Sequence, residues 1–246
     1  MSLNEKEFIS ELTRIFGENG MNKLLNLEKC KKLYLLTERM LEENEKYNLT
    51  AITEPTEVIL NHYCDSATLS DILPKGARLI DVGCGAGFPT LPLAILREDL
   101  HITALDSTAK RVNYVRESAE LLGITGVSAV CMRAEEGARL VEYREKFDFA
   151  TARAVAEMRV LCELTLPYVK IGGQLIAMKG KNAEYELSGA AKAISILGGK
   201  HSATRSVTLK NGTKEPYSHP LIIVDKKNKT PGAYPRGYAQ ISKKPL

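Results

Sequence analysis

Three glycines at alternate positions are the first residues in the chain whose spacing suggests chemistry. Gly83, Gly85 and Gly87 follow an apolar run that ends in Asp81, and a helical pattern begins at Thr90. Glycines at a turn from strand to helix let the backbone approach a ligand closely, and the first N–H groups of the helix can bind it. The pattern predicts a nucleotide-like ligand, although dinucleotide sites share it and a tight turn alone could need two of the glycines.

The spacing and a pair of carboxylates narrow the ligand class. GxGxG after Asp81 is typical of S-adenosylmethionine (SAM)-dependent methyltransferases, whereas dinucleotide sites use GxGxxG. SAM carries a cation and no phosphate, so it tolerates an acid that would repel a diphosphate. Asp106 ends the next expected strand, where a carboxylate can accept hydrogen bonds from both ribose hydroxyls. Glu135 follows the third strand, at the usual adenine contact, although the adjacent Glu136 shows that a surface charge could stand there instead.

Two cationic residues are expected at the ends of later strands. Arg153 and Lys179 fall where ligands of parallel sheets collect, and they are our candidates for catalytic residues that orient the cofactor or the methyl acceptor. The alternative is that both pair with surface carboxylates. His62 and Asp65 lie on an earlier helix and could face the same cleft, or His62 could be a hydrogen-bonded core residue.

A parallel sheet would position these residues. Strand-like runs alternate with helical stretches, and strands are expected at 77–82, 102–105, 127–131, 147–151 and 173–178. Helices are expected from 90 and at 110–122, 136–143 and 157–168. Unbroken apolar strands alternating with helices imply a mostly parallel sheet covered on both faces. Two further strands, at 203–209 and 220–224 around an Asn211-Gly212 turn, bring the expected number to seven.

The residues before this sheet have a helical pattern. Apolar residues recur at helical spacing from 5 to 46, with a break at 17–20, and a further helix is expected at 58–69. A packing layer without chemistry is the simplest role for such helices. We therefore divide the chain into a helical extension, residues 1–75, and a methyltransferase domain, residues 76–246.

Composition excludes several classes of protein. The chain of 246 residues is 44% hydrophobic and 26% charged, which is ordinary for a globular domain. No apolar run is long enough for a membrane helix and the first residues are too polar for a secretory signal, so we expect a cytoplasmic protein. The five cysteines are scattered without metal-ligand spacing, so neither a metal site nor a disulfide framework is expected. A monomer is the default expectation.

Basic residues are concentrated near the C-terminus. Residues 200–246 contain ten Lys or Arg against two Asp or Glu, and tyrosines are interleaved with them. Cations can meet phosphates and aromatic rings can stack on unpaired bases, although a solvated basic tail is the alternative. The candidates for substrate contact are His62, from the cleft, and the basic residues Lys226, Lys227, Arg236, Lys243 and Lys244.

Several motifs in order along most of the chain resemble the RsmG (GidB) family of bacterial small-subunit rRNA guanine-N7 methyltransferases. The matching segments are Asn48–Ile52, His62 with Asp65-Ser66, Asp81–Pro89, Leu105–Ser107, Lys110-Arg111, Arg153-Ala154, Lys179-Gly180, Tyr234–Arg236 and Lys243–Leu246. Two positions depart from the family pattern: Cys84 stands where threonine is common, and Thr90 where glycine is common.

The resemblance implies a Rossmann-like SAM-dependent methyltransferase fold with an N-terminal helical extension. It also implies a target guanine in the 530 loop of 16S rRNA, at position 527 in 16S numbering, in free rRNA or in the small ribosomal subunit. By the same resemblance, SAM is contacted by Gly83, Phe88, Ala134, Glu135 and Arg153. The expected cofactor site consists of these five residues together with Asp81, Gly85 and Gly87 of the glycine motif and Asp106 at the end of the second expected strand.

A guanine N7 acceptor requires little from the protein. N7 has a lone pair and no proton, so no general base is needed, and alignment can contribute on the order of 7–11 kcal/mol. The sequence after the fourth strand is Arg153-Ala-Val-Ala156 rather than the Asn/Asp-Pro-Pro-aromatic motif that binds an exocyclic amine. The alternatives are an NAD(P)-linked dehydrogenase, a SAM enzyme acting on another RNA, a protein or a small molecule, and a non-catalytic RNA-binding module.

Overall fold

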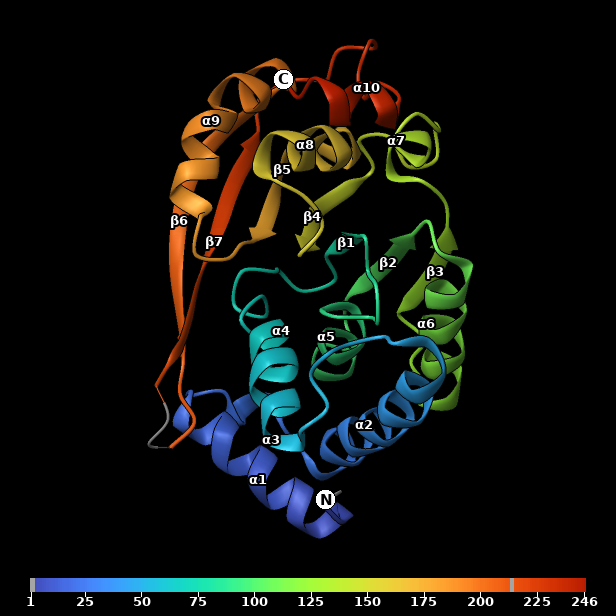
Figure 1. The fold of residues 1–246 in the computed structure, drawn as a ribbon, viewed down its shortest axis with the longest axis vertical. Coiled ribbons are helices and arrows are strands. Elements are labelled where there is room, and N and C mark those ends of the chain that lie inside the picture. The colour runs from blue at the N-terminus through green and yellow to red at the C-terminus, as the bar shows by residue number, and fades with distance from the viewer. Residues whose placement is uncertain (1–2, 213–214) are drawn as a thin grey trace.

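A seven-stranded sheet forms the centre of the computed structural model, which describes residues 3–212 and 215–246 (Figure 1). The strand order is β3-β2-β1-β4-β5-β7-β6. Strands β1 to β5 are parallel to one another, and β7 is antiparallel to both β5 and β6. The strands are β1 (Arg78–Val82), β2 (His101–Asp106), β3 (Val127–Cys131), β4 (Phe147–Arg153), β5 (Val169–Met178), β6 (Gly199–Leu209) and β7 (Tyr217–Lys226). The expected fold class is confirmed.

Ten α-helical segments surround the sheet in the described residues. They are α1 (Glu5–Glu18), α2 (Leu27–Tyr47), α3 (Pro55–Val58), α4 (Asp65–Ala67), α5 (Thr90–Leu96), α6 (Ala109–Leu121), α7 (Ala134–Gly137), α8 (Met158–Thr165), α9 (Ala183–Ile196) and α10 (Tyr238–Lys243). The first helix begins where the sequence provides a capping box, because Asn4 and Glu7 exchange side-chain hydrogen bonds to each other's backbone N–H.

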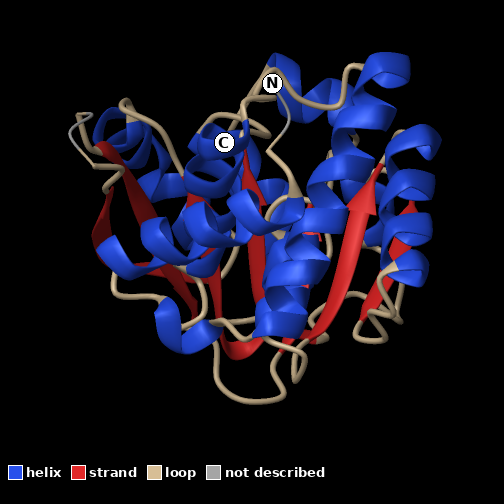
Figure 2. Ribbon diagram, turned by 90° about the horizontal axis from the view of Figure 1, so that it is seen from below, coloured by secondary structure: helices blue, strands red, loops and turns tan. Residues whose placement is uncertain are grey.

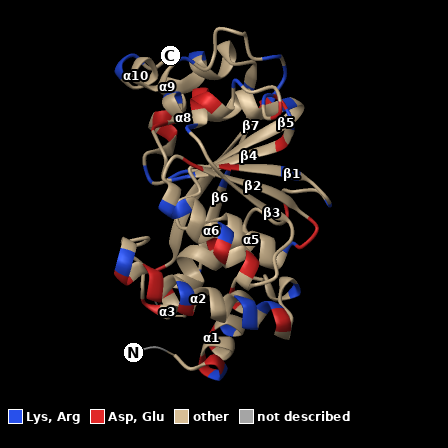
Figure 3. Ribbon diagram, turned by 90° about the vertical axis from the view of Figure 1, so that its right-hand side faces the viewer, with Lys and Arg blue, Asp and Glu red and all other residues tan. Residues whose placement is uncertain are grey.

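The helices lie in layers on the two faces of the sheet. Figure 3 shows α8, α9 and α10 on one side, and α5 and α6 on the other with α1 and α2 outside them. Figure 2 shows the strands side by side with helices crossing them. Because the parallel strands all end at one edge, the loops after β1, β2, β3, β4 and β5 meet there.

The helical extension shares its core with the sheet domain. Phe8, Leu12 and Leu36 belong to the same buried cluster as Leu91 and Val115 of the helices that cover the sheet. The extension is thus packed directly onto the rest of the chain. The boundary at residue 75 between the helical extension and the methyltransferase domain is a proposal from the sequence pattern. One buried core contains residues from both sides of it.

A π-helical turn joins α3 to α4. Ile59–Cys64 forms this wider turn, so residues 55–67 make one helical stretch where the sequence predicted a plain helix at 58–69. Such turns occur frequently at functional sites. Here the turn carries His62, and Asp65 follows directly after it.

One predicted helix is shorter in the structure, and two helices, α9 and α10, were not predicted. The helix expected at 136–143 is reduced to α7, whose last residue is Gly137, followed by turns. Helix α9 was not predicted at all. Its buried positions include Ala183, Ala190 and Ala193, and such small side chains give a weak hydrophobic period.

The C-terminal hairpin of β6 and β7 reaches the first helix (Figure 1). Asn19 donates a hydrogen bond to the backbone oxygen of Lys210 (2.9 Å), and Arg14 donates to the side chain of Asn211 (2.7 Å). The predicted turn at Asn211-Gly212 borders residues 213–214, which lie outside the described residues. The hairpin therefore ties the end of the chain to its beginning.

Candidate cofactor and acceptor site

The glycine loop lies between β1 and α5, as predicted. Gly83 has a φ of +78°, and a Cβ built on it would lie 2.6 Å from Cγ2 of Val155. Gly85 also has a positive φ, of +54°, but a Cβ there would meet nothing closer than 4.0 Å. Gly83 is thus the position at which a side chain would collide with the loop after β4.

Asp106 holds the glycine loop and faces the same space. Its Oδ2 accepts a hydrogen bond from the backbone N–H of Gly85 (3.1 Å), and its Oδ1 accepts one from Thr108 (2.8 Å). Each oxygen retains a lone pair, because a carboxylate has about four acceptor sites. The carboxylate can therefore hold the loop and still accept two ribose hydroxyls.

A cleft of about 260 Å³ opens beside these residues, and we call it the Gly83 cleft. It is lined by Val82, Gly83, Leu105, Asp106, Ser107, Arg111, Met132, Arg133, Ala134, Glu135, Ala154, Val155, Leu164 and Tyr238. The residues fit SAM, because the lining combines the two carboxylates of Asp106 and Glu135 with a Gly83 cradle that a Cβ would fill. Four of the expected cofactor residues meet here: Gly83, Asp106, Ala134 and Glu135.

Sequence reasoning missed part of this lining. Val155 and Leu164 come from the loop after β4 and from α8, and Tyr238 comes from α10. Tyr238 lies 5.4 Å from the guanidinium carbon of Arg133, measured to the ring centroid. The sequence marked Tyr238 only as an aromatic residue within a basic tail, so its place in the cleft needed the fold.

Asp81 lies beneath the glycine loop rather than in the cleft. It is fully buried, and its Oδ2 accepts a hydrogen bond from the Thr90 hydroxyl (2.7 Å). Burial raises the pKa of this carboxyl to about 6. The expected direct contact with the cofactor is therefore corrected to a supporting one. Thr90, which departs from the family pattern, is the hydroxyl partner that this buried acid requires.

Phe88 lies in a stack of side chains behind the cleft. Its ring is parallel to that of His62, with centroids 4.1 Å apart, and the guanidinium carbon of Arg153 lies 5.5 Å from its centroid. Phe88 is 5% exposed and does not line the Gly83 cleft. The ring therefore contributes to packing between the glycine loop and the helical extension.

Arg153 is held by groups from the π-helical turn and the residue after it. Its Nη1 donates to the Asn61 backbone oxygen and to Asp65 Oδ2, both at 2.9 Å. Its Nη2 lies 3.2 Å from His62 Nδ1. Arg153 thus joins β4 to the helical extension. The alternative considered for Arg153, pairing with a carboxylate, is present, but that carboxylate is buried rather than on the surface.

His62 is a neutral group in this environment. Burial and the adjacent Arg153 cation lower its pKa from the usual 6.5 to about 3. Below pH 6.5 the unfolded chain takes up a proton at His62 that the folded chain does not, so this residue makes the free energy of unfolding fall as the pH falls.

We expect His62→Gln to flatten the acid limb of the stability curve. Between pH 7 and pH 5 wild type should lose about 2 kcal/mol more free energy of unfolding than the variant, measured by urea titration at each pH. Asp81, whose raised pKa acts in the opposite direction, is present in both proteins and cancels. Parallel curves for the two proteins would contradict the assignment of a neutral His62.

A second cavity, of about 200 Å³, lies after β4 and β5, and we call it the β4–β5 cavity. It is lined by Asp65, Arg153, Ala154, Met178, Lys179, Gly180, Tyr217 and His219. Ala154 also lines the Gly83 cleft, and its positive φ of 56° turns the chain between the two spaces. The cavity is therefore the neighbour of the cofactor cleft.

Lys179 lines the β4–β5 cavity with its ammonium group engaged elsewhere. Nζ donates to the Ala156 backbone oxygen (2.7 Å) and forms an ion pair with Glu186 (2.6 Å). The alternative considered for Lys179, pairing with a carboxylate, is the arrangement found in the structure. Lys179 fixes the loop after β4 against α9.

Two of the expected RNA-contacting residues, Lys226 and Arg236, have their cationic groups paired within the protein. Lys226 is fully buried, and its Nζ donates to the Leu166 backbone oxygen and to the Thr230 hydroxyl, both at 2.7 Å. Burial lowers its pKa to about 8. Arg236 donates to the buried Glu163 through Nε and Nη2. For the fully buried Lys226 the prediction of phosphate contact is wrong, because its ammonium group satisfies internal acceptors. The Arg236 side chain is 17% exposed, and phosphate contact by it stays a prediction.

The other basic candidates lie on the surface. Lys227, Lys243 and Lys244 are exposed, and Lys227 pairs with Asp225 (2.8 Å). Lys243 is the last residue of α10 and Lys244 follows it, and α10 lies on the same side of the sheet as α8. Arg236 therefore anchors the segment from which these two lysines project.

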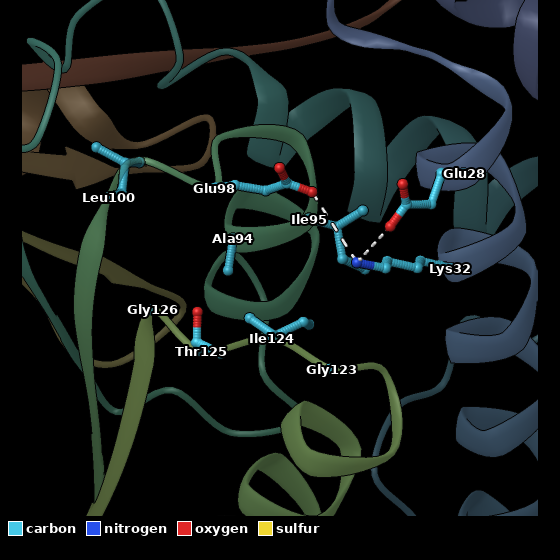
Figure 4. Close-up of a pocket in the computed structure, with 10 residues that line it drawn as sticks. All are labelled: Glu28, Lys32, Ala94, Ile95, Glu98, Leu100, Gly123, Ile124, Thr125 and Gly126. Atoms are coloured by element: carbon cyan, nitrogen blue, oxygen red, sulfur yellow. Dashed lines mark ion pairs between the residues drawn. The ribbon is translucent and has the colours of Figure 1, made fainter.

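A third cavity, of about 270 Å³, lies at the opposite edge of the sheet (Figure 4). Leu100 and Gly126 line it just before β2 and β3 begin. Figure 4 shows Lys32 between two carboxylates, 3.1 Å from Glu28 and 3.9 Å from Glu98. This cavity is thus remote from the residues expected to bind cofactor.

Within the described residues, no metal-ligand cluster, membrane-spanning helix or disulfide contributes to the site. Among residues 3–212 and 215–246, no three His, Cys, Asp or Glu residues are grouped to hold a metal ion. Within the same residues, no helix has the length and apolar character to cross a membrane. All five cysteines are free thiols, and four of them are buried.

Sequence comparison gives consistent matches along the chain. Residues 29–214 match the model of the GidB family, described as rRNA small subunit methyltransferase G. Proteins named ribosomal RNA small subunit methyltransferase G are similar to it in Clostridium perfringens (47% identity; 90% of this chain, 92% of the relative) and in Lactobacillus acidophilus (43%; 99% and 100%).

Solved structures agree on the fold. The precorrin-6y C5,15-methyltransferase of Geobacter metallireducens superposes with a TM-score of 0.51 at 18% identity, covering 73% of this chain and 92% of the other. A SAM-dependent O-methyltransferase of Thermotoga maritima gives a TM-score of 0.50 at 15% identity, covering 77% and 72%. At these identities the likeness concerns the fold alone.

Proposed function

The chain belongs to the GidB family of rRNA small subunit methyltransferases, and we propose that it transfers the methyl group of SAM to N7 of guanine 527 in the 530 loop of 16S rRNA. The fold and the family make it a class I SAM-dependent methyltransferase. The observation that carries the proposal is the Gly83 cleft, which shares Ala154 with the neighbouring β4–β5 cavity.

We assign the cofactor to the Gly83 cleft. Asp106 would accept the ribose hydroxyls, Ala134 and Glu135 would border the adenine, and Gly83 would let the backbone lie against the ligand. Gly85 and Gly87 shape the loop, and Asp81, Phe88 and Arg153 support it from behind. When bound, SAM supplies an electrophilic methyl group on a sulfonium centre.

The protein's part in the reaction is alignment. Guanine N7 has a lone pair and no proton, so no side chain has to remove one. Holding the acceptor in the β4–β5 cavity places it beside the cofactor cleft, and such positioning can contribute on the order of 7–11 kcal/mol. Val155 and Leu164 exclude water from the cleft with apolar surface.

Methyl transfer to small-subunit rRNA tests this function. Tritiated SAM is offered with free 16S rRNA, with intact small subunits and with total cell extract, each from cells lacking the modification. Label in guanine N7 of the rRNA supports the proposal. Label in protein or in a small molecule instead would favour a SAM enzyme of another specificity. We propose that the enzyme is cytoplasmic and that it acts as a monomer.

We expect RNA affinity to depend on the exposed end of α10. Replacing Lys243 and Lys244 by Ala should weaken rRNA binding and lower the slope of log K against log salt by about 1.5, because each lost phosphate contact removes about 0.7–0.9. The slope is measured by filter binding over a salt series. Lys6→Ala with Lys31→Ala removes the same charge from exposed positions on α1 and α2 and serves as control. Equal slopes for both double variants would refute the role of α10.

A further inference from the structure

The charged side chains that line the β4–β5 cavity are paired within the protein. Asp65 is 2% exposed, and its two carboxylate oxygens lie 2.9 Å from Arg153 Nη1 and 2.5 Å from His219 Nε2. Lys179, which also lines the cavity, pairs with Glu186. Because these groups satisfy one another, they offer little to the edges of an entering base. Its flat faces are then the surface that the protein can hold.

Tyr217 lies at the mouth of this cavity. It is 42% exposed, whereas Asp65 and His219 are 2% and 5% exposed. Its ring centroid lies 5.3 Å from that of His219, and the two planes are tilted by 37°. Burial and the nearby Asp65 carboxylate raise the pKa of the Tyr217 hydroxyl, so the ring is neutral at neutral pH. A half-exposed neutral ring at the entrance of a cavity is a surface on which an unpaired base can stack.

Strand β7 fixes the position of this ring. Residues two apart in a strand point to the same face, so Tyr217 and His219 face the same side of the sheet. Tyr217 is paired in register with the buried Leu209 of β6, and His219 is held by Asp65. A ring that is already held in place loses little freedom when a base stacks on it.

Stacking is compatible with the orientation that the reaction needs. The contact uses the face of the base and leaves all of its edges free, so N7 can point toward the Gly83 cleft. The cavity volume of about 200 Å³ is below the range of about 300–1,000 Å³ that holds drug-sized ligands, and it suits a single base. Enzymes that modify bases hold the extruded base by such stacking.

Methyl transfer changes the charge of the stacked base. The lone pair of N7 forms the new bond to the methyl carbon, and the electron pair of the broken carbon–sulfur bond stays on sulfur. No proton moves, so the positive charge passes from sulfur to the purine ring. The face of an aromatic ring attracts a cation. A ring stacked on the base therefore binds the transition state more strongly than it binds neutral guanine, which is the condition for faster reaction.

We propose that Tyr217 stacks on the target guanine and stabilises the positive charge that the base gains during methyl transfer. This proposal rests on the proposed function and adds a catalytic residue to it, because the ring would touch the reacting base. Asp65 and His219 contribute by holding the strand that carries the ring.

Replacing the ring tests the proposal in single-turnover kinetics, which product release does not limit. Tyr217→Leu should lower kcat/KM about 30-fold, with at least about fivefold in kcat, because both stacking and the attraction for the cation are lost. Tyr217→Phe keeps the ring and should stay within about threefold of wild type. The substrate is unmodified 16S rRNA, free or in small subunits, whichever wild type methylates.

Tyr185→Leu is the matched control for this change. Tyr185 is 84% exposed on α9 and does not line the β4–β5 cavity, so its loss should leave kcat/KM unchanged. SAM affinity should be the same in all three variants, because neither tyrosine lines the Gly83 cleft. The proposal is overturned if Tyr217→Leu is as active as wild type, if Tyr217→Phe is as slow as Tyr217→Leu, or if the loss is confined to KM.

A binding measurement needs no methyl transfer. The chain contains no tryptophan, so Tyr217→Trp introduces a single indole. At about pH 6, 7-methylguanosine should quench its fluorescence at concentrations at least about fivefold lower than guanosine, because only the methylated base is a cation. Tyr185→Trp should show no such preference.

The binding result separates this proposal from the proposed function. Preferential quenching by 7-methylguanosine without methyl transfer to rRNA would leave the stacking assignment standing and overturn the proposed function. Equal quenching of Tyr217→Trp by the two nucleosides, or no quenching by either, would overturn the stacking assignment.

Discussion

Gly83→Ala is expected to weaken SAM binding about 100-fold, which corresponds to about 2.7 kcal/mol. The added Cβ would lie 2.6 Å from Cγ2 of Val155, and the backbone φ of +78° gives it no relief. Val155 is stiff about χ1, so either its side chain moves within the Gly83 cleft or the loop moves away from it. The dissociation constant is measured by calorimetry on the full chain.

Gly85→Ala provides the matched control. It places the same side chain at a positive φ two residues away, where the nearest atom is 4.0 Å from the Cβ. Both variants should lose about 1–2 kcal/mol of folding free energy from the left-handed backbone, but Gly85→Ala should bind SAM within about fivefold of wild type. Val155→Ala should restore part of the affinity of Gly83→Ala. Equal affinities for the two glycine variants would contradict this account of the loop.

Arg236→Met should lower the free energy of unfolding by about 3–5 kcal/mol. Glu163 is fully buried, and Arg236 meets it with its backbone N–H and two guanidinium nitrogens at 2.7–2.9 Å. The variant would leave this carboxylate without its cation. The segment that Arg236 anchors carries Tyr238 into the Gly83 cleft, so SAM affinity should fall as well. Urea unfolding and calorimetry measure the two effects.

Removing the buried charge should reverse most of this loss. Glu163→Gln in the Arg236→Met background eliminates the uncompensated carboxylate, and stability should recover by more than half. Lys243→Ala, an exposed change on the same segment, should stay within about 0.5 kcal/mol of wild type. If Arg236→Met is as stable as Lys243→Ala, the pair with Glu163 does not anchor the C-terminus.

The sheet and the cofactor loop could be predicted because their signals are local. Four of the five parallel strands, β1, β2, β4 and β5, carry several buried apolar residues, and Gly83 and Asp106 are fixed by strand ends that the sequence marks directly. The unpredicted helix α9 has the opposite character. Its core contacts use Ala190 and Ala193, whose burial is decided by the fit against neighbouring elements rather than by side-chain hydrophobicity.

Charge on its own does not reveal burial, and the basic C-terminus illustrates this. In a strand, Lys226 shares a face with Ile222 and Val224, both fully buried, so the period of two already places it toward the core. That signal could have separated Lys226 from Lys227. For Arg236 no local signal exists, because its partner Glu163 is distant in the chain.

The composition of the two cavities also depends on contacts that sequence order does not reveal. Tyr238 reaches the cofactor cleft, and His219 reaches Asp65, only because the C-terminal segments return to the edge where the parallel strands end. The sequence identified Asp65 and Arg153 as neighbours of the cleft. It could not show that Arg153 binds one carboxylate oxygen of Asp65 while His219 lies against the other.

Mapping the methyl group on small-subunit rRNA tests the central claim most directly. The full chain is incubated with tritiated SAM and unmodified 16S rRNA, free or in small subunits, and the product is analysed by nucleoside digestion and by borohydride and aniline cleavage. We predict 7-methylguanosine at a single site, position 527, and none with Gly83→Ala under limiting SAM. A wild-type protein that binds SAM but labels no guanine N7 in any of these substrates would contradict it.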